Sequence, residues 1–107
     1  MEWRRTKEYR EWRIGVIRRD TKCVVCGSIK GRQAHHLNHA SFFPTQRFNL
    51  DNGVTLCTSC HSQYHNNYHK STKEKCTVDA FVNFMKLVEY FKQKDINVRL
   101  NDTRGSN

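Results

Sequence analysis

The chain has 107 residues, which suits one compact domain and leaves little room for two. Lysine and arginine outnumber aspartate and glutamate by 19 to 10, so the formal net charge is +9 with histidine neutral. No apolar run approaches the roughly 18 residues of a membrane-spanning helix, and the first ten residues lack the apolar stretch of a secretory signal. We therefore expect a cytoplasmic protein with no membrane-spanning segment.

The basic excess suggests a polyanionic partner, most often nucleic acid, with an anionic membrane surface as the lesser alternative. It is concentrated in residues 1–50, which carry 11 basic and four acidic side chains. Such a surface can follow a phosphate backbone, although a solvated helix face without a partner has the same composition. Charge alone therefore does not separate a protein that binds nucleic acid from one that cuts it.

Residues 6–20 are predicted to form a helix, because Tyr9, Trp12 and Val16 recur at helical spacing and would face the core. Arginines lie on the other faces of this helix, in the segment before it and in a later loop. Such side chains can position a duplex through its phosphates, and ordinary solvent exposure is the alternative. The candidates for DNA contact are Arg4, Arg5, Arg10, Arg13 and Arg47.

Four of the five cysteines form two Cys-x-x-Cys pairs, Cys23 with Cys26 and Cys57 with Cys60. Two such pairs in a small chain without a secretory signal predict one structural Zn²⁺, bound by four thiolates with no open position. A redox dithiol is the alternative, and the odd cysteine count disfavours a disulfide scaffold. Cys76 has no partner in this pattern and is expected to be a buried small residue or a free thiol.

Between the cysteine pairs, residues 33–37 and 53–56 are predicted to form two short strands, joined by a long ordered loop. Residues 58–69 are expected to form a short helix, for which Thr58 or Ser59 could be the cap. Strands and helices in one short chain indicate an α+β class.

A polar linker over residues 70–76 leads to a second long helix, expected over residues 77–94 with Thr77 as its cap. The tail, residues 95–107, contains alternating apolar residues and is expected to form a short extended segment followed by disorder. The core stripe of the helix is expected to consist of Val78, Phe81, Met85, Val88 and Phe91.

All six histidines fall between or just after the cysteine pairs. On a helix, His61 and His65 would project from one face, a spacing by which two imidazoles can bind one metal ion. In a strand, the side chains of His35 and His36 point to opposite sides, so that one can bind the metal while the other stays free as a base.

Three segments occur in the order and at the spacing of the HNH endonucleases: AHHL at 34–37, the asparagine of LDNGVTLC, and CTSCHSQYH at 57–65. The chain resembles this family over about residues 12–69, and WRIGVIRRDTKCVVCG is similar to the phage-type members. The resemblance implies a zinc-stabilised ββα-metal core over residues 21–69. An N-terminal and a C-terminal helix would flank this core in a single domain of residues 1–107.

The resemblance also implies an activity, the metal-dependent hydrolysis of phosphodiester bonds in DNA. His36 would be the general base that takes a proton from the attacking water. His35, at a position where many relatives have aspartate, would bind the catalytic divalent metal together with His61 and His65. Mg²⁺ or Mn²⁺ is the expected metal, while a histidine-rich ligand set also suits Ni²⁺, Co²⁺ or Zn²⁺.

Asn52 would brace the loop between the strands by hydrogen bonds and keep the base oriented, with Asn49 as the alternative asparagine. His39 and His69 are expected to be phosphate contacts or plain surface residues. His69 continues the helical series and is the substitute if His65 is not a ligand.

One active site per chain would nick one strand of double-stranded DNA, with the protein acting as a monomer or weak homodimer. The family resemblance favours an enzyme of phage or mobile-element type, such as a homing endonuclease, in the cytoplasm of a bacterial cell. The alternative is a non-catalytic zinc module that binds DNA or assists a phage packaging complex. RNA as the substrate is a third reading that the sequence leaves open.

Overall fold

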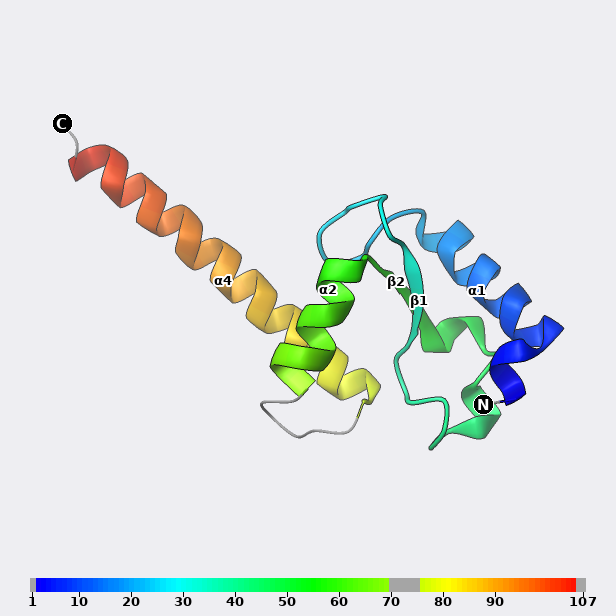
Figure 1. The fold of residues 1–107 in the computed structure, drawn as a ribbon. Helices are drawn as coiled ribbons and strands as arrows, with labels where there is room; N and C mark the ends of the chain where they lie inside the picture. Colours follow the sequence, from blue (N-terminus) through cyan, green and yellow to red (C-terminus); the bar gives the residue numbers. More distant parts are fainter. Residues whose placement is uncertain (1, 70–75, 106–107) are drawn as a thin grey trace.

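A two-stranded antiparallel sheet lies at the centre of the computed structural model, which describes residues 2–69 and 76–105 (Figure 1). Strand β1 (Gln33–His36) pairs with β2 (Gly53–Leu56), so that His36 lies opposite Gly53. Helix α1 (Lys7–Asp20) and helix α2 (Thr58–Ser62) pack against this hairpin from its two sides. The structure is thus a small α+β fold, and both strands lie within one residue of their predicted bounds.

Helix α1 confirms the helix predicted over residues 6–20. The side-chain oxygen of Thr6 accepts a hydrogen bond from the backbone N–H of Tyr9 at 3.2 Å, which caps the helix, and a short 3₁₀ turn, η1 (Glu2–Arg5), precedes it. Trp12 and Val16 are buried against the hairpin, and Tyr9 is half-buried. The predicted apolar stripe is therefore the packed face.

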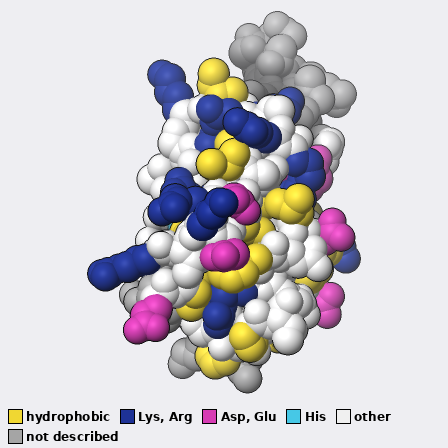
Figure 2. Space-filling view, turned by 90° about the vertical axis from the view of Figure 1, so that its right-hand side faces the viewer, with side chains coloured by type: hydrophobic (Ala, Val, Ile, Leu, Met, Phe, Trp, Pro, Cys, Tyr) yellow, Lys and Arg dark blue, Asp and Glu magenta, His cyan; other side chains and the backbone are white. Residues whose placement is uncertain are grey.

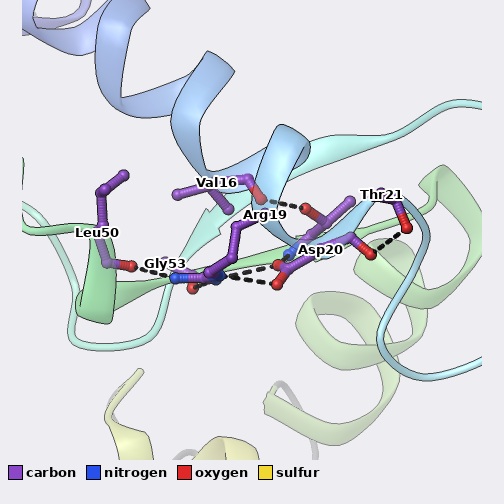
Figure 3. A network of polar contacts seen from close by, with 7 residues as sticks. Val16, Arg19, Asp20, Thr21, Leu50 and Gly53 are labelled. Atoms are coloured by element: carbon purple, nitrogen blue, oxygen red, sulfur yellow. Dashed lines mark hydrogen bonds and ion pairs between the residues drawn. The ribbon is translucent and has the colours of Figure 1, made fainter.

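A polar network holds the last turn of α1 against β2 (Figure 3). The guanidinium of Arg19 donates to the carbonyl oxygens of Leu50 and Gly53, at 2.8 and 2.6 Å, and to the carboxylate of Asp20. Asp20 in turn accepts from the backbone N–H of Thr55 at 2.8 Å. Burial alone would raise the pKa of Asp20, but the hydrogen bonds from Arg19 and Thr55 outweigh it and lower this pKa.

Helix α2 begins directly after Cys57, whose Sγ accepts a hydrogen bond from the backbone N–H of Cys60 at 3.4 Å. The expected cap residues, Thr58 and Ser59, are instead part of the first helical turn, because the cysteine sulfur already occupies the capping position. The chain continues as a π-helical segment, η4 (Gln63–His69). The predicted helix is therefore present, with a change of hydrogen-bond pattern after α2.

Helix α4 (Val78–Gly105) begins at the expected place, where the Thr77 hydroxyl accepts from the backbone N–H of Ala80 at 3.2 Å. The extended segment expected after residue 94 is wrong, because the backbone over residues 95–105 is helical. No proline or glycine interrupts the helix before its last residue, and a lone extended segment would have no strand to pair with. Figure 1 shows α4 leading away from the hairpin.

The face of α4 that packs on the rest of the protein differs from the predicted stripe. Val78 and Met85 are 40% and 37% exposed, because the buried face passes through Phe84 instead. The residues that pack are Ala80, Phe81, Phe84 and, partly buried, Val88. Phe81 and Phe84 form one small core with Leu56, Tyr64 and buried cysteines, between the hairpin, η4 and the start of α4, and Val88 packs against it.

Some expectations fall outside the described part of the chain. These are the linker over residues 70–75, the last two residues of the tail, and the side chains of Phe91 and His69. Over the residues that were described, no helix is both long enough and apolar enough to cross a membrane.

Candidate metal sites and the histidine cleft

The four cysteines predicted to bind zinc lie together. Their sulfur atoms are all within 4.8 Å of one another, and Sγ of Cys26 lies 3.5 Å from Sγ of Cys57. Cys26 is exposed, the other three are buried, and all four are free thiols. Four sulfur donors at this separation form a cluster that can hold a metal ion such as zinc.

Local backbone geometry builds each half of the cluster. After the first pair, the backbone N–H of Gly27 donates to the carbonyl oxygen of Cys23 at 2.9 Å, with φ at +80°. A residue with a Cβ is strained in that conformation, so glycine suits the turn. The second pair spans the start of α2, to which β2 delivers Cys57.

The thiols of the cluster differ in acidity. Burial alone would raise the pKa of Cys23, but backbone hydrogen bonds from Cys26 and Cys57 lower it to about 6. Burial and the neighbouring thiols raise the pKa of Cys60. Backbone dipoles therefore favour the thiolate form of Cys23, which is the form in which cysteine binds a metal ion.

A second cluster consists of His35 from β1, His61 from α2 and His65 from η4. One ring nitrogen from each lies within 4.8 Å of those of the other two. His35 is 5% exposed, and its buried Nε2 has no hydrogen-bond partner among the described residues. An unsatisfied buried nitrogen is costly, and a metal ion shared with the other two imidazoles would satisfy it.

The charge state of this cluster also suits a metal ligand. Burial lowers the pKa of His35 well below its usual value, and the neighbouring histidines add to the effect. Burial lowers the pKa of His61 as well. Neutral imidazole is the form that binds metals, so the donor set fits a divalent ion.

His36 is on the opposite side of β1 from this cluster. Its ring is stacked on that of Trp12, with centroids 3.9 Å apart and an interplanar angle of 8°. Its Nε2 lies 2.8 Å from the carbonyl oxygen of Arg47. Since a carbonyl can only accept, Nε2 carries the proton and Nδ1 keeps its lone pair. Burial lowers the pKa of His36, which favours this neutral form.

Asn52 holds the loop between the strands and does not belong to the histidine cluster. It is 4% exposed, and its Nδ2 donates to the carbonyl oxygens of Asn38 and Gln46 at 3.0 and 3.3 Å. Its Oδ1 accepts from the backbone N–H of Asn38 at 2.8 Å. These bonds close the loop that contains Arg47, the hydrogen-bond partner of His36.

The alternative asparagine, Asn49, has a more local part. Its side-chain oxygen accepts from the backbone N–H of Asp51 at 2.9 Å and so caps a short 3₁₀ turn, η3 (Leu50–Asn52). Its carbonyl oxygen accepts from Nε1 of Trp12 at 2.9 Å.

One cleft of about 430 Å³ is lined by both the histidine cluster and His36. Of the predicted DNA contacts, Arg4, Arg13 and His39 line it. The guanidinium of Arg47 lies 5.0 Å from the ring centroid of Trp3, another lining residue. The exposed Arg5 and Arg10 are outside this lining. Two of the five candidate arginines therefore face the cleft directly.

Figure 2 shows the face of the molecule that includes α1. Lysine and arginine side chains are spread over it with acidic side chains among them, and no histidine is visible there. This face is therefore a mixed charged surface on which the histidine side chains do not show.

Sequence reasoning missed two features of the site. Trp12 was expected only as a core residue, yet it stacks on His36. Cys76, expected to be buried or free, is buried and also lines the cleft. Neither feature has a signal in the sequence, because each depends on the packing of separate elements: Trp12 on α1 meets His36 on β1, and Cys76 meets residues of β1, α2 and η4 in the cleft.

Comparison of the chain with family models, with curated proteins and with solved structures gives no significant match. The fold and the clusters themselves define the class of protein, a small α+β protein with a four-cysteine cluster that can hold a metal such as zinc. Its cleft is lined by three histidines that can share a metal ion.

Proposed function

We propose that the protein is a metal-dependent endonuclease of the HNH type, which hydrolyses phosphodiester bonds in double-stranded DNA. The observation that carries the proposal is one cleft lined by a three-histidine cluster and by a fourth histidine outside that cluster. Hydrolysis of a phosphodiester needs charge stabilisation and a base for the attacking water, and these two sets of residues can supply them.

The metal part of the site consists of His35, His61 and His65. A divalent ion bound there would stabilise charge on the phosphoryl oxygens and on the leaving oxygen. Mg²⁺ or Mn²⁺ would be the physiological ion, although the all-imidazole donor set also suits Ni²⁺, Co²⁺ or Zn²⁺. The buried Nε2 of His35 is the donor with the most to gain from the ion, because it has no hydrogen-bond partner in the described part of the chain.

The proton-accepting part of the site is His36. Its Nε2–H donates to Arg47, which leaves Nδ1 to accept the proton of the attacking water. Arg4 and Arg13 line the same cleft and would bind phosphates beside the scissile one. Asn52 holds the loop and would act through Arg47 without touching the substrate.

The four-cysteine cluster would hold structural Zn²⁺. Four sulfur donors fill a tetrahedral shell and leave no position for water or substrate. Cys23, Cys57 and Cys60 belong to the small core, so the ion would connect the turn at residues 23–26 to the start of α2.

The test is a nicking assay on supercoiled plasmid, with zinc-loaded protein and Mg²⁺, Mn²⁺, Ni²⁺, Co²⁺ or Zn²⁺ added in turn. His36→Ala is expected to lower the rate by about 100-fold or more while DNA binding is retained, because a general base contributes about 10²–10⁴ in rate. Circular dichroism and zinc content verify that the variant is folded. Unchanged nicking by His36→Ala would contradict the assignment.

The same assay separates the alternatives. A wild-type protein that binds DNA but cuts with none of these ions would be a non-catalytic zinc module, the reading that the cysteine cluster and the basic excess alone would support. Preferred cleavage of RNA would instead change the substrate class.

A further inference from the structure

We infer that Trp12 is the positioning residue for His36, holding the plane of its imidazole in the cleft. This inference rests on the proposed function of His36 as the general base. The indole and the imidazole are nearly parallel, at 8°, with centroids 3.9 Å apart. That separation places the two ring faces in direct contact.

The indole is itself held in place. Trp12 is 2% exposed, and its Nε1 donates to the carbonyl oxygen of Asn49 at 2.9 Å. Burial and a hydrogen bond at the ring edge together restrict both the tilt and the rotation of the indole. A rigid surface can therefore orient the imidazole that stacks on it.

Strand β2 leaves room for this stack. Gly53 lies opposite His36 in the sheet, and a Cβ there would come within 2.7 Å of Cζ2 of Trp12 and 2.5 Å of Cγ2 of Val16. The φ of Gly53 is −133°, which any residue can adopt, so the position needs glycine for the close approach alone. The packing of α1 on β2 and the stack of Trp12 on His36 thus depend on the same missing side chain.

The stack adds a constraint that the hydrogen bond of His36 does not provide. The bond from Nε2 to Arg47 fixes one atom in the plane of the imidazole. The ring can still rotate about the line of that bond, which would swing Nδ1 away from the water it must deprotonate. A flat indole against the ring face opposes this rotation. An error of about 1 Å in such a geometry can cost about 100-fold in rate.

The test uses the full zinc-loaded chain and three variants, Trp12→Phe, Trp12→Leu and Gly53→Ala. Trp12→Leu is expected to lower kcat for Mn²⁺-dependent nicking by about 100-fold with the KM for DNA unchanged. Trp12→Phe keeps a flat ring and should retain most of kcat. Gly53→Ala keeps the indole but displaces it, so its kcat should fall between the two.

Nuclear magnetic resonance of the His36 ring gives a readout that does not depend on activity. Ring protons above an indole face resonate upfield, and His36→Gln identifies the signals. We expect the upfield shift to disappear in Trp12→Leu, to persist in part in Trp12→Phe and to change in Gly53→Ala.

Val16→Ala is the matched control, because Val16 is also buried on α1 but has no ring to stack on His36. If it lowers kcat as much as Trp12→Leu does, Trp12 acts only through the packing of α1 and the inference is wrong. Unchanged kcat and unchanged His36 signals in Trp12→Leu also overturn it. If instead His36→Ala nicks normally, the proposed function fails, while the ring signals still decide whether Trp12 orients His36.

Discussion

His35 and His36 are consecutive in the chain, yet their imidazoles lie on opposite sides of strand β1 and both line the same cleft. The ring of His35 lies 5.4 and 5.1 Å from the rings of His61 and His65, whereas the ring of His36 lies 3.9 Å from that of Trp12. Alternation along a strand separates them, with α2 and η4 on one side and α1 on the other. Two adjacent residues can thereby have different chemistry, one as a metal ligand and one as a base.

The four-cysteine cluster is expected to be essential for folding. Cys57→Ser removes a thiolate ligand but keeps a hydroxyl that can cap α2. Zn²⁺ affinity should therefore fall, and helix content should fall with it because zinc binding is coupled to folding. Removal of zinc from the wild type by a chelator should unfold the hairpin and α2, since zinc binding contributes roughly 10–16 kcal/mol to the folding of small modules. Zinc content and circular dichroism measure both effects. Cys76→Ser is the control, because Cys76 is a buried thiol outside the cluster, and this variant should keep one Zn²⁺ per chain. Full zinc content in Cys57→Ser would contradict the prediction.

The histidine cluster is expected to bind a second metal ion. His61→Ala should weaken Mn²⁺ or Ni²⁺ binding to the zinc-loaded protein by more than the roughly 10–100-fold that loss of an outer-shell partner costs. Isothermal titration calorimetry measures the affinity. Asn66→Ala is the control, because Asn66 follows His65 in η4, is exposed, and donates to Ser62 at the end of α2. Equal affinities in the two variants would show that the cluster is not the site.

Asn52 is expected to stabilise the loop whose residue Arg47 accepts the hydrogen bond of His36. Asn52→Ala leaves an N–H and two carbonyl oxygens without their partner, which should lower the free energy of unfolding by about 3 kcal/mol. Urea denaturation measures the loss. Asn49→Ala removes one exposed capping bond and should cost about 1 kcal/mol. A larger loss in Asn49→Ala than in Asn52→Ala would reverse the assigned roles.

The network of Arg19 and Asp20 is expected to stabilise the contact between α1 and β2. Hydrogen bonds lower the pKa of Asp20, so its contribution is present above the usual value of 3.8 and is lost as the pH falls through the lower folded value. At neutral pH, Asp20→Asn should reduce the free energy of unfolding by about 2 kcal/mol.

Glu11→Gln provides the control for that measurement, because Glu11 forms an exposed pair with Lys7 at 3.7 Å. Its effect should stay below about 0.5 kcal/mol. Equal losses in the two variants, measured by urea denaturation at pH 7, would mean that the network adds nothing beyond surface charge.

The arginines of the cleft are expected to contribute more to DNA binding than those outside it. Arg4→Ala and Arg13→Ala should each weaken binding and reduce the salt slope of log K by about 1, as expected for one lost phosphate contact. Arg10→Ala, on an exposed position outside the cleft lining, should change the slope less. Fluorescence anisotropy at several salt concentrations measures these slopes; equal slopes would indicate a diffuse basic surface.

The predictable parts of the fold are those that short spacings determine. The stripe of Trp12 and Val16 placed α1, and the Cys-x-x-Cys spacing placed both halves of the four-cysteine cluster. The end of α4 could not be predicted in the same way. Alternating apolar residues after position 94 resemble a strand, but a strand also needs a partner, and sequence spacing does not tell whether one lies nearby.

The sequence by itself determined which side chains stand three or four positions apart, because local backbone geometry sets those distances. Only the tertiary structure decided which distant groups meet: Cys23 with Cys57, His35 with His65, and Trp12 with His36. The position of Trp12 depends on the absence of a Cβ at Gly53, against which α1 packs closely. It also depends on the hydrogen bonds by which Arg19 and Asp20 hold α1 on β2. The spacing of residues along the chain does not show which side chains of different elements pack together. The contact of Trp12 with His36 could therefore be found only in the tertiary structure.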